Sequence, residues 1–199
     1  MTLRTTLIAG ALVGLGSLGA APATAQPFNP NKIEIAFNRY YTHGEINAMM
    51  RDIARAYPDL VTLEKIGESR QGREMLVAIV TNSETGSDRD KPAMWIDGNV
   101  HGNEVQAAEA VLYTLWYVTK EHGQNEKLTE LLDNVALYLL PSQNPDGRDY
   151  WFSHPNTQHS SRSNQRPVDN DGDGLFDEDG YDDLDGDGMI TQMWVRDPD

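Results

Sequence analysis

The 199-residue chain contains no cysteine, which excludes disulfide cross-links and thiol chemistry. It is also poor in basic residues, with 16 Lys and Arg against 31 Asp and Glu and a formal net charge of −15. Phosphate binding needs clustered Lys and Arg, so neither nucleic acid nor an anionic membrane is an expected partner. Hydrophobic residues make up 39% of the chain, enough for a core. Length and composition therefore predict one ordinary domain or part of a larger one.

Long apolar runs are absent after the first 25 residues. Arg4 precedes the apolar stretch 7–21, and an A-x-A pattern ends at Ala25, before Gln26. This arrangement is typical of a secretory signal peptide. The stretch is shorter than the about 20 residues of a membrane-spanning helix, although a retained anchor is the alternative. We predict a signal peptide at residues 1–25 and a secreted or periplasmic protein without membrane contact after cleavage.

The middle of the chain alternates between strand and helix patterns. Apolar residues at helical spacing, preceded by a capping box of Thr42 and Glu45, predict a helix over about 43–56. A second, longer helix is predicted over 104–121, which lacks Gly and Pro. Short apolar runs predict strands at 61–66, 75–81, 93–97 and 135–140.

This order predicts an α/β fold with a mixed, mostly parallel sheet flanked by helices. The strand at 93–97 is nearly continuously apolar, so it is expected to be buried. Functional groups in such folds gather in loops that leave the carboxyl ends of strands. The loops 98–103 and 142–148 are therefore the candidate site.

The first of these loops contains His101 and Glu104, three positions apart at a strand-to-helix corner. Both side chains can then lie on one side of the backbone and reach a single Zn²⁺ at about 2 Å. The bare pair is a weak signal, because a Glu at a helix start also stabilises the helix dipole without a metal. The position between strand and helix favours the zinc interpretation.

Acidic residues are concentrated at the C-terminal end, where residues 169–199 hold twelve of the 31 acids and one base. Two D-x-D-x-D-G patterns lie fourteen residues apart, and a chain bent by glycine can bring such carboxylates around Ca²⁺ at about 2.4 Å. Position 12 of each loop, counted from its first Asp, lacks the glutamate of an EF-hand. This favours a calcium-stapled loop, and a solvated acidic linker is the alternative. The expected calcium ligands are Asp169, Asp171, Asp173, Asp177, Asp183, Asp185 and Asp187.

Four motifs make the stretch 40–148 resemble the zinc carboxypeptidases of the M14 peptidase family. They are YTHGEI at 41–46, IGESRQGR at 66–73, WIDGNVHGNE at 95–104 and NPDG at 144–147. The resemblance implies that His101 and Glu104 are the first two zinc ligands and that Arg73 lines a substrate subsite. It also implies that zinc activates a water against a peptide bond. NPDG would shape the edge of the site, the alternative being a turn without chemistry.

Several parts implied by the resemblance are missing from these 199 residues. None of His122, His154 and His159 stands in the context of the third zinc ligand. There is also no Asn-Arg pair for a substrate carboxylate and no late strand with a catalytic glutamate, so the general base is unknown. We therefore expect the N-terminal part of a catalytic domain at 26–168, an Asp-rich insertion at 169–199, and a fold incomplete at the C-terminus.

The leading hypothesis is a secreted zinc metallocarboxypeptidase that acts on a peptide or amide substrate. Two alternatives stay open, namely a non-catalytic, calcium-dependent binding or structural module on the same scaffold and an amide-cleaving deacylase. The sequence leaves the oligomeric state and the substrate preference undecided.

Overall fold

The structure is a computed structural model that describes residues 33–155, 162–178, 183–191 and 196. The predicted signal peptide and His159 lie outside these residues. No helix in the described part of the chain is both long and apolar enough to cross a membrane. The helices are α1 (His43–Ala56), α2 (Val105–Glu121), α3 (Glu126–Asn134) and α4 (Pro145–Ser153), and the strands are β1 (Val61–Glu68), β2 (Glu74–Val80), β3 (Ala93–Asp97) and β4 (Ala136–Leu140).

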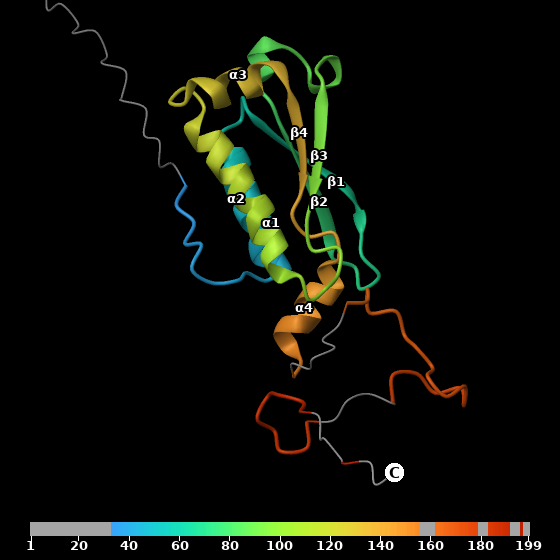
Figure 1. Ribbon diagram of the computed structural model, residues 1–199. Coiled ribbons are helices and arrows are strands. Elements are labelled where there is room, and N and C mark those ends of the chain that lie inside the picture. Colours follow the sequence, from blue (N-terminus) through green and yellow to red (C-terminus); the bar gives the residue numbers. More distant parts are fainter. Residues whose placement is uncertain (1–32, 156–161, 179–182, 192–195, 197–199) are drawn as a thin grey trace, which may run out of the picture.

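The four strands form one mixed sheet in the order β1-β2-β4-β3, shown in Figure 1. β3 runs parallel to β4, with Ala93 opposite Ala136 and Asp97 opposite Leu140. The β1–β2 and β2–β4 pairs are antiparallel. The predicted α/β fold with a mixed sheet is confirmed, but the described strands are not mostly parallel. The short connection between β1 and β2 can join only antiparallel neighbours, because a parallel pair needs a long crossover.

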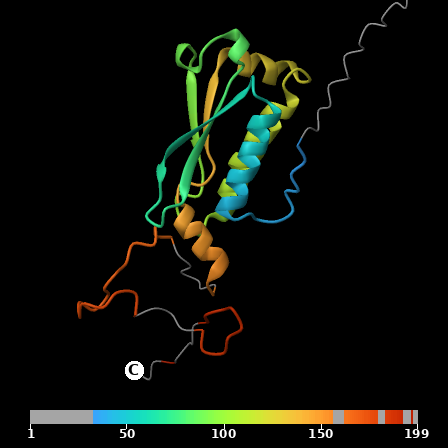
Figure 2. The ribbon, with the colours of Figure 1, turned by 180° about the vertical axis from the view of Figure 1, so that it is seen from behind.

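One face of the sheet is covered by α1 and α2, which lie side by side in both Figure 1 and Figure 2. The predicted capping box at the start of α1 is present, with the backbone N–H of Thr42 donating to Glu45 Oε2 at 2.8 Å. The core forms between these two helices and the strands. Its fully buried members include Ile46, Met50, Ile53, Val80, Leu112, Leu115 and Leu139.

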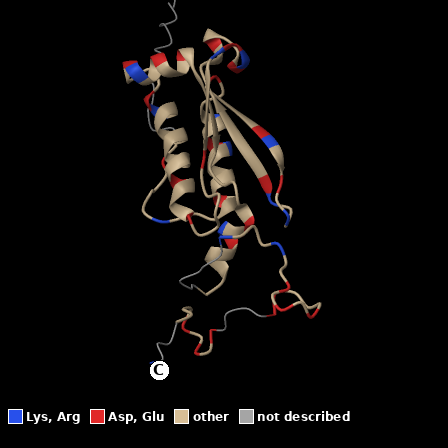
Figure 3. Ribbon diagram, turned by 45° about the vertical axis from the view of Figure 1, so that its right-hand side comes forward, with Lys and Arg blue, Asp and Glu red and all other residues tan. Residues whose placement is uncertain are grey.

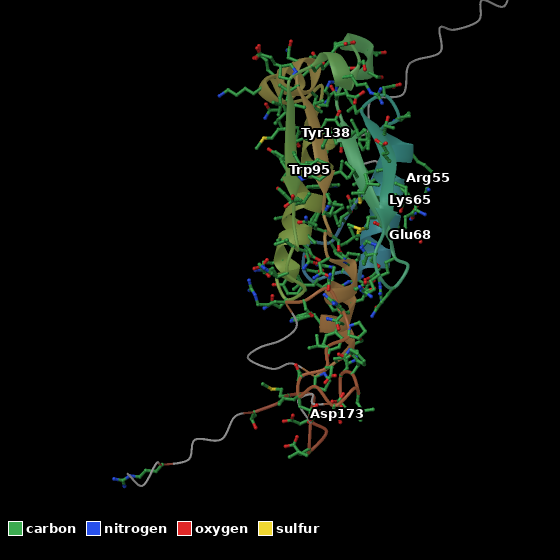
Figure 4. All side chains as sticks on the ribbon, turned by 90° about the vertical axis from the view of Figure 1, so that its right-hand side faces the viewer. Arg55, Lys65, Glu68, Trp95, Tyr138 and Asp173 are labelled. Atoms are coloured by element: carbon green, nitrogen blue, oxygen red, sulfur yellow. The ribbon has the colours of Figure 1, made fainter. Side chains whose placement is uncertain are left out.

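The strand β3 is exposed, contrary to the expectation that it is buried. Met94 is 57% exposed and Trp95 is 52% exposed. Trp95 stacks beside Tyr138 of β4 on the outer face of the sheet, with ring centroids 6.5 Å apart, and both are labelled in Figure 4. Continuous apolar character predicts burial only where both faces are covered. Here β3 is the edge strand of the described sheet. The helices α1 and α2 cover one face of that sheet, and the face that carries Trp95 is open.

Two helices were not predicted from the sequence. α3 is capped by Asn125, whose side chain accepts from the backbone N–H groups of Lys127 and Leu128. α4 occupies the segment that was expected to be a loop and turn. Asn144 caps it by accepting from the N–H of Gly147 at 3.0 Å, and Pro145 stands in its first turn. Asn at the cap followed by Pro is a helix-start signal, so the sequence contained the information for α4.

The difference in exposure between α2 and the edge strand β3 predicts a contrast between two substitutions. Leu112→Ala removes a fully buried side chain of α2 and is expected to lower the free energy of unfolding by about 2–5 kcal/mol. Met94→Ala, on the edge strand β3 where the side chain is 57% exposed, is expected to change it by less than about 0.5 kcal/mol. Urea unfolding of the two variants measures both values, and a comparable loss at Met94 would contradict the exposure of its side chain.

Candidate metal and substrate site

The loops that leave β3 and β4 lie side by side, as the sequence predicted. Gly98 N–H donates to Leu140 O, Gln143 N–H to Gly98 O and Asn144 N–H to Asn99 O, each at 3.0 Å. Because β3 and β4 are parallel, their carboxyl ends meet at the same edge of the sheet. Figure 1 shows this edge next to α4 and the β1–β2 turn.

Three backbone segments cross closely at this edge. A Cβ placed on Gly102 would stand 2.6 Å from the carbonyl carbon of Gly147. A Cβ on Gly147 would stand 2.6 Å from the carbonyl oxygen of Ser163. Side-chain-free residues are required where backbones approach this closely. The loop with His101, the start of α4 and the segment after residue 161 therefore hold one another in place.

Arg148 is fully buried and ties these segments to the helices. Its guanidinium donates to Asn99 Oδ1 at 3.0 Å, to Val105 O at 2.7 Å and to the carbonyl oxygen of Tyr41, and it forms an ion pair with Glu109. Burial lowers the pKa of Arg148, and the carboxylate of Glu109 opposes that shift. A buried charge is tolerated when its hydrogen bonds are satisfied in this way.

Asn99, which binds Arg148, also holds the loop that carries His101. It is almost completely buried, with a φ of 57°, a left-handed conformation that Asn tolerates better than most residues. Its Nδ2 donates to the carbonyl oxygen of His101 at 2.7 Å and, at 3.3 Å, to that of Gly102. The backbone that carries His101 is thus fixed from inside the protein.

The structure brings His101 and Glu104 together at the surface of this edge. His101 Nδ1 lies 2.9 Å from Glu104 Oε1, and the two side chains are 40% and 36% exposed. Arg162 approaches the same atoms, with Nη2 2.8 Å from His101 Nδ1 and Nη1 3.5 Å from Glu104 Oε1. The hydrogen bond with His101, helped by the charge of Arg162, lowers the pKa of Glu104. Glu104 is therefore a carboxylate at neutral pH.

The donor set fits a divalent cation. With a proton on Nδ1, His101 donates to Glu104 and its Nε2, 3.2 Å from Arg162 Nη2, accepts from the guanidinium; in the other tautomer, Nδ1 and Glu104 Oε1 turn two lone pairs toward each other. Two lone pairs that face each other become favourable when both point at one cation. A neutral imidazole and a carboxylate are two zinc ligands of the usual types.

A third protein ligand is not found within the described ranges. No other His, Asp or Glu there forms a three-membered cluster with His101 and Glu104. His122 lies 3.5 Å from Asp133 beside α3, and His154 stacks on Tyr150 at the end of α4. Both therefore belong to other parts of the fold, and two donors alone give an incomplete zinc site.

Arg73, expected in a substrate subsite, is held in two ion pairs. Its Nε lies 2.7 Å from Asp149 Oδ2, and its Nη1 lies 2.7 Å from Asp146 Oδ1. Burial acts to lower the pKa of Arg73, but the hydrogen bonds to Asp149 and Asp146 outweigh it and leave the pKa raised. The guanidinium thus anchors the β1–β2 turn to α4, and a different arginine, Arg70, lines the adjacent groove.

That groove has a volume of about 530 Å³ and opens beside the His101–Glu104 pair. Val100, which precedes His101, lines it together with Arg162, which contacts both members of the pair. Arg70, Met75 and the start of α4 form other parts of its wall. His101 and Glu104 are not themselves lining residues, so the groove adjoins the pair through Val100 and Arg162.

The acidic segment contains two loops with the same hydrogen bonds. In the first, the N–H groups of Gly172 and Gly174 donate to the two oxygens of Asp169, and in the second those of Gly186 and Gly188 donate to Asp183. Figure 3 shows acidic residues along this segment, and Asp173 is labelled in Figure 4. Carboxylate oxygens converge within 4.8 Å in two groups: Asp169, Asp171, Asp173 and Glu178, and Asp183, Asp185 and Asp187.

Asp177 is outside the first cluster, contrary to expectation. It has a φ of 61°, its N–H donates to Val168 O at 2.8 Å and its Oδ1 accepts from Val168 N–H at 3.0 Å. This pairing closes the base of the loop. The turn of the backbone at Asp177 brings Glu178 to the cluster in its place.

Comparison with known proteins identifies the family. A family model described as zinc carboxypeptidase matches residues 46–187. The chain belongs to the M14 family of zinc carboxypeptidases. The match begins within α1, covers the helices and strands that follow, and ends in the second acidic loop.

Similar proteins support this zinc carboxypeptidase assignment. Carboxypeptidase B of Astacus astacus is 34% identical over 65% of this chain and 40% of its own length. Carboxypeptidase D of Homo sapiens is 28% identical over 65% of this chain and 9% of its own length. The inactive metallocarboxypeptidase ECM14 of Saccharomyces cerevisiae is 27% identical over 70% of this chain and 33% of its own length. The chain thus spans less than half of each of these relatives.

Solved structures agree with the fold. Bovine thrombin-activatable fibrinolysis inhibitor, in complex with tick carboxypeptidase inhibitor, superimposes with a TM-score of 0.55 and 27% identity over 67% of this chain and 40% of that one. Another structure of thrombin-activatable fibrinolysis inhibitor gives a TM-score of 0.52 and 31% identity over 56% of this chain and 27% of that one. This member of the family therefore has part of the fold of these proteins.

Sequence reasoning missed several residues that build the candidate site. Asp146 and Arg148 stand in and after NPDG, which was interpreted only as a turn. A capped helix start at Asn144 would have signalled that both side chains sit on a helix. Arg162 has no local signal, because its contact with His101 joins residues 61 positions apart.

The close backbone crossing yields a matched pair of glycine substitutions. Gly102→Ala forces a Cβ into the backbone of Gly147 and is expected to destabilise the protein by about 1–3 kcal/mol. Gly44→Ala in α1 meets nothing within 4 Å and is expected to stabilise it by about 0.5–1 kcal/mol. Thermal unfolding of both variants gives the comparison. A neutral Gly102→Ala would mean that the two loops are further apart than described.

Proposed function

We propose that this protein is a zinc metallocarboxypeptidase in which His101 and Glu104 supply two of the zinc ligands. The convergence of these two side chains beside a groove carries the proposal. When bound, zinc polarises a carbonyl group and lowers the pKa of water. Because the described chain offers two ligands, the third ligand and the general base are proposed to come from other residues of the whole protein.

The residues on this chain have distinct roles in the proposed reaction. Glu104 presents a carboxylate at neutral pH, and the backbone of His101 is held by Asn99 so that the imidazole meets that carboxylate. Arg162 places a guanidinium beside the pair, where it can stabilise negative charge that develops on a substrate carbonyl oxygen. The groove binds the peptide, and residues 1–25 direct the protein to export.

Metal analysis of the whole protein tests the zinc assignment. His101→Ala and Glu104→Gln are each expected to weaken zinc binding by more than the roughly 10–100-fold that loss of an outer hydrogen-bond partner costs. His122→Ala, next to Asp133, is the matched control and should keep the zinc content of the wild type. Absence of stoichiometric zinc in the wild type, or unchanged zinc and peptidase activity in His101→Ala, would refute the proposal.

We also propose that the two acidic loops bind Ca²⁺. Their matching hydrogen bonds and convergent carboxylates support this, since each cluster places three or more like charges within 4.8 Å. A cation would relieve the repulsion between them. If these loops bind calcium but the protein holds no zinc, the observations instead favour a non-catalytic, calcium-dependent module on the carboxypeptidase scaffold.

Calcium-dependent stability tests the acidic loops. A ligand at 100 times its dissociation constant stabilises a fold by about 2.7 kcal/mol, so Ca²⁺ should raise the melting temperature of the wild type. The double variant Asp171→Asn with Asp173→Asn should lose the part of this rise that the first loop provides. Asp177→Asn, outside the cluster, should keep it. No rise in the wild type would exclude the calcium proposal.

The deacylase alternative differs from a peptidase in its substrate. Comparison of an N-acetyl amino acid with an N-acetyl tripeptide as substrates of the whole protein separates the two. Faster hydrolysis of the tripeptide is the expected result, because four separate segments of the chain line the groove and a longer substrate can contact more of them.

A further inference from the structure

The turn between β1 and β2 is rigidly built. Gly72 N–H donates to Ser69 O at 3.0 Å and Ser69 N–H donates to Arg73 O at 2.8 Å. Gly72 has a φ of 78°, a conformation that glycine adopts without strain. The turn therefore has one well-defined shape at the end of the hairpin.

A buried carboxylate fixes this turn against α4. Asp146 is only 2% exposed and accepts from Ser69 Oγ at 2.6 Å, from Gln71 N–H at 3.0 Å and from Arg73 Nη1 at 2.7 Å. Three positions of the turn are thus bound to the first turn of one helix. The hairpin end cannot move without breaking charge-assisted hydrogen bonds to a buried group.

Arg70 lies in the middle of this turn, and no contact within the described chain holds its side chain. Its side chain is exposed and forms no hydrogen bond or ion pair with any described residue. It lines the groove that also contains Arg162 and Val100. Because the turn is rigid, little backbone entropy is lost when Arg70 binds a ligand.

The groove has an excess of positive charge in a strongly acidic chain. Among the described residues that line it, Asp146 is the one acid, and its charge is already matched by Arg73. The guanidinium groups of Arg70 and Arg162 are the lining cations. Arg162 is engaged with His101 and Glu104, which leaves Arg70 to attract an anion from the ligand.

We propose that Arg70 is a specificity-determining residue that binds a carboxylate of the peptide in the groove. The guanidinium fork matches a carboxylate with two parallel hydrogen bonds, which a neutral amide cannot replace. The proposal rests on the proposed peptidase function, because it places the substrate in the groove beside His101. The carboxylate can belong to an acidic side chain or to the C-terminus of the peptide, and the two sources are separable.

Calorimetric titration of the whole protein with three peptides tests the proposal. The peptides are acetyl-Ala-Glu-Ala-amide, acetyl-Ala-Gln-Ala-amide and acetyl-Ala-Gln-Ala with a free C-terminus. Binding of at least one of the two peptides with a carboxylate should be about three- to tenfold tighter than that of the neutral peptide. Preference for the Glu peptide identifies a side-chain carboxylate, and preference for the free acid identifies the terminal one.

Arg70→Gln is expected to abolish the preference, and Arg70→Lys to retain part of it, because the charge stays while the fork is lost. Arg89→Gln, an exposed arginine in the turn Asp88–Asp90, is the matched control and should keep the preference. Equal binding of all three peptides, or a preference that survives in Arg70→Gln, would overturn the proposal. Zinc content measured on the same samples keeps this outcome separate from a failure of the peptidase assignment, since Arg70 contacts neither His101 nor Glu104.

Discussion

The buried guanidinium of Arg148 joins the parts of the molecule on which the candidate site depends. It reaches the chain before α1 through Tyr41, the loop after β3 through Asn99 and the first turn of α2 through Val105. Glu109 neutralises it within the same helix α2. A charge removed from water costs several kcal/mol unless partners compensate, so these segments can meet only in an arrangement that satisfies Arg148. The position of His101 follows from that requirement.

Local signals in the sequence were sufficient for much of the fold. The capping box of Thr42 and Glu45 and the apolar spacing after it gave α1, and the run Ala93–Asp97 gave β3 with its observed bounds. His101 and Glu104 could be brought together from sequence because they are three residues apart in one turn. The family resemblance rested on the same stretches, and the family match confirms it.

Other features depend on contacts that spacing does not encode. The contact of Arg148 with Tyr41 spans 107 residues, and that of Arg73 with Asp146 spans 73, so neither partner is visible locally. Burial of β3 was mispredicted because it depends on what covers the outer face of the sheet. Glu178, and not Asp177, joins the first acidic cluster because the backbone turns at Asp177. Counting acidic positions in the sequence cannot detect such a turn.

Charge is unevenly distributed along the chain. Arginines line the groove, while carboxylates gather in the two loops that follow it. The segment with Arg162 leads into the first acidic loop, whose base is closed by Val168 and Asp177. An ion that orders this loop would therefore also restrict the segment that presents Arg162 to His101 and Glu104.

The central claim is that one imidazole and one carboxylate share a zinc ion at the carboxyl edge of the sheet. Anomalous diffraction at the zinc absorption edge, from crystals of the whole protein, locates that ion directly. The account predicts one peak about 2.0–2.2 Å from both His101 Nδ1 and a carboxylate oxygen of Glu104. A zinc peak bound elsewhere, with His101 and Glu104 still paired to Arg162, would contradict it.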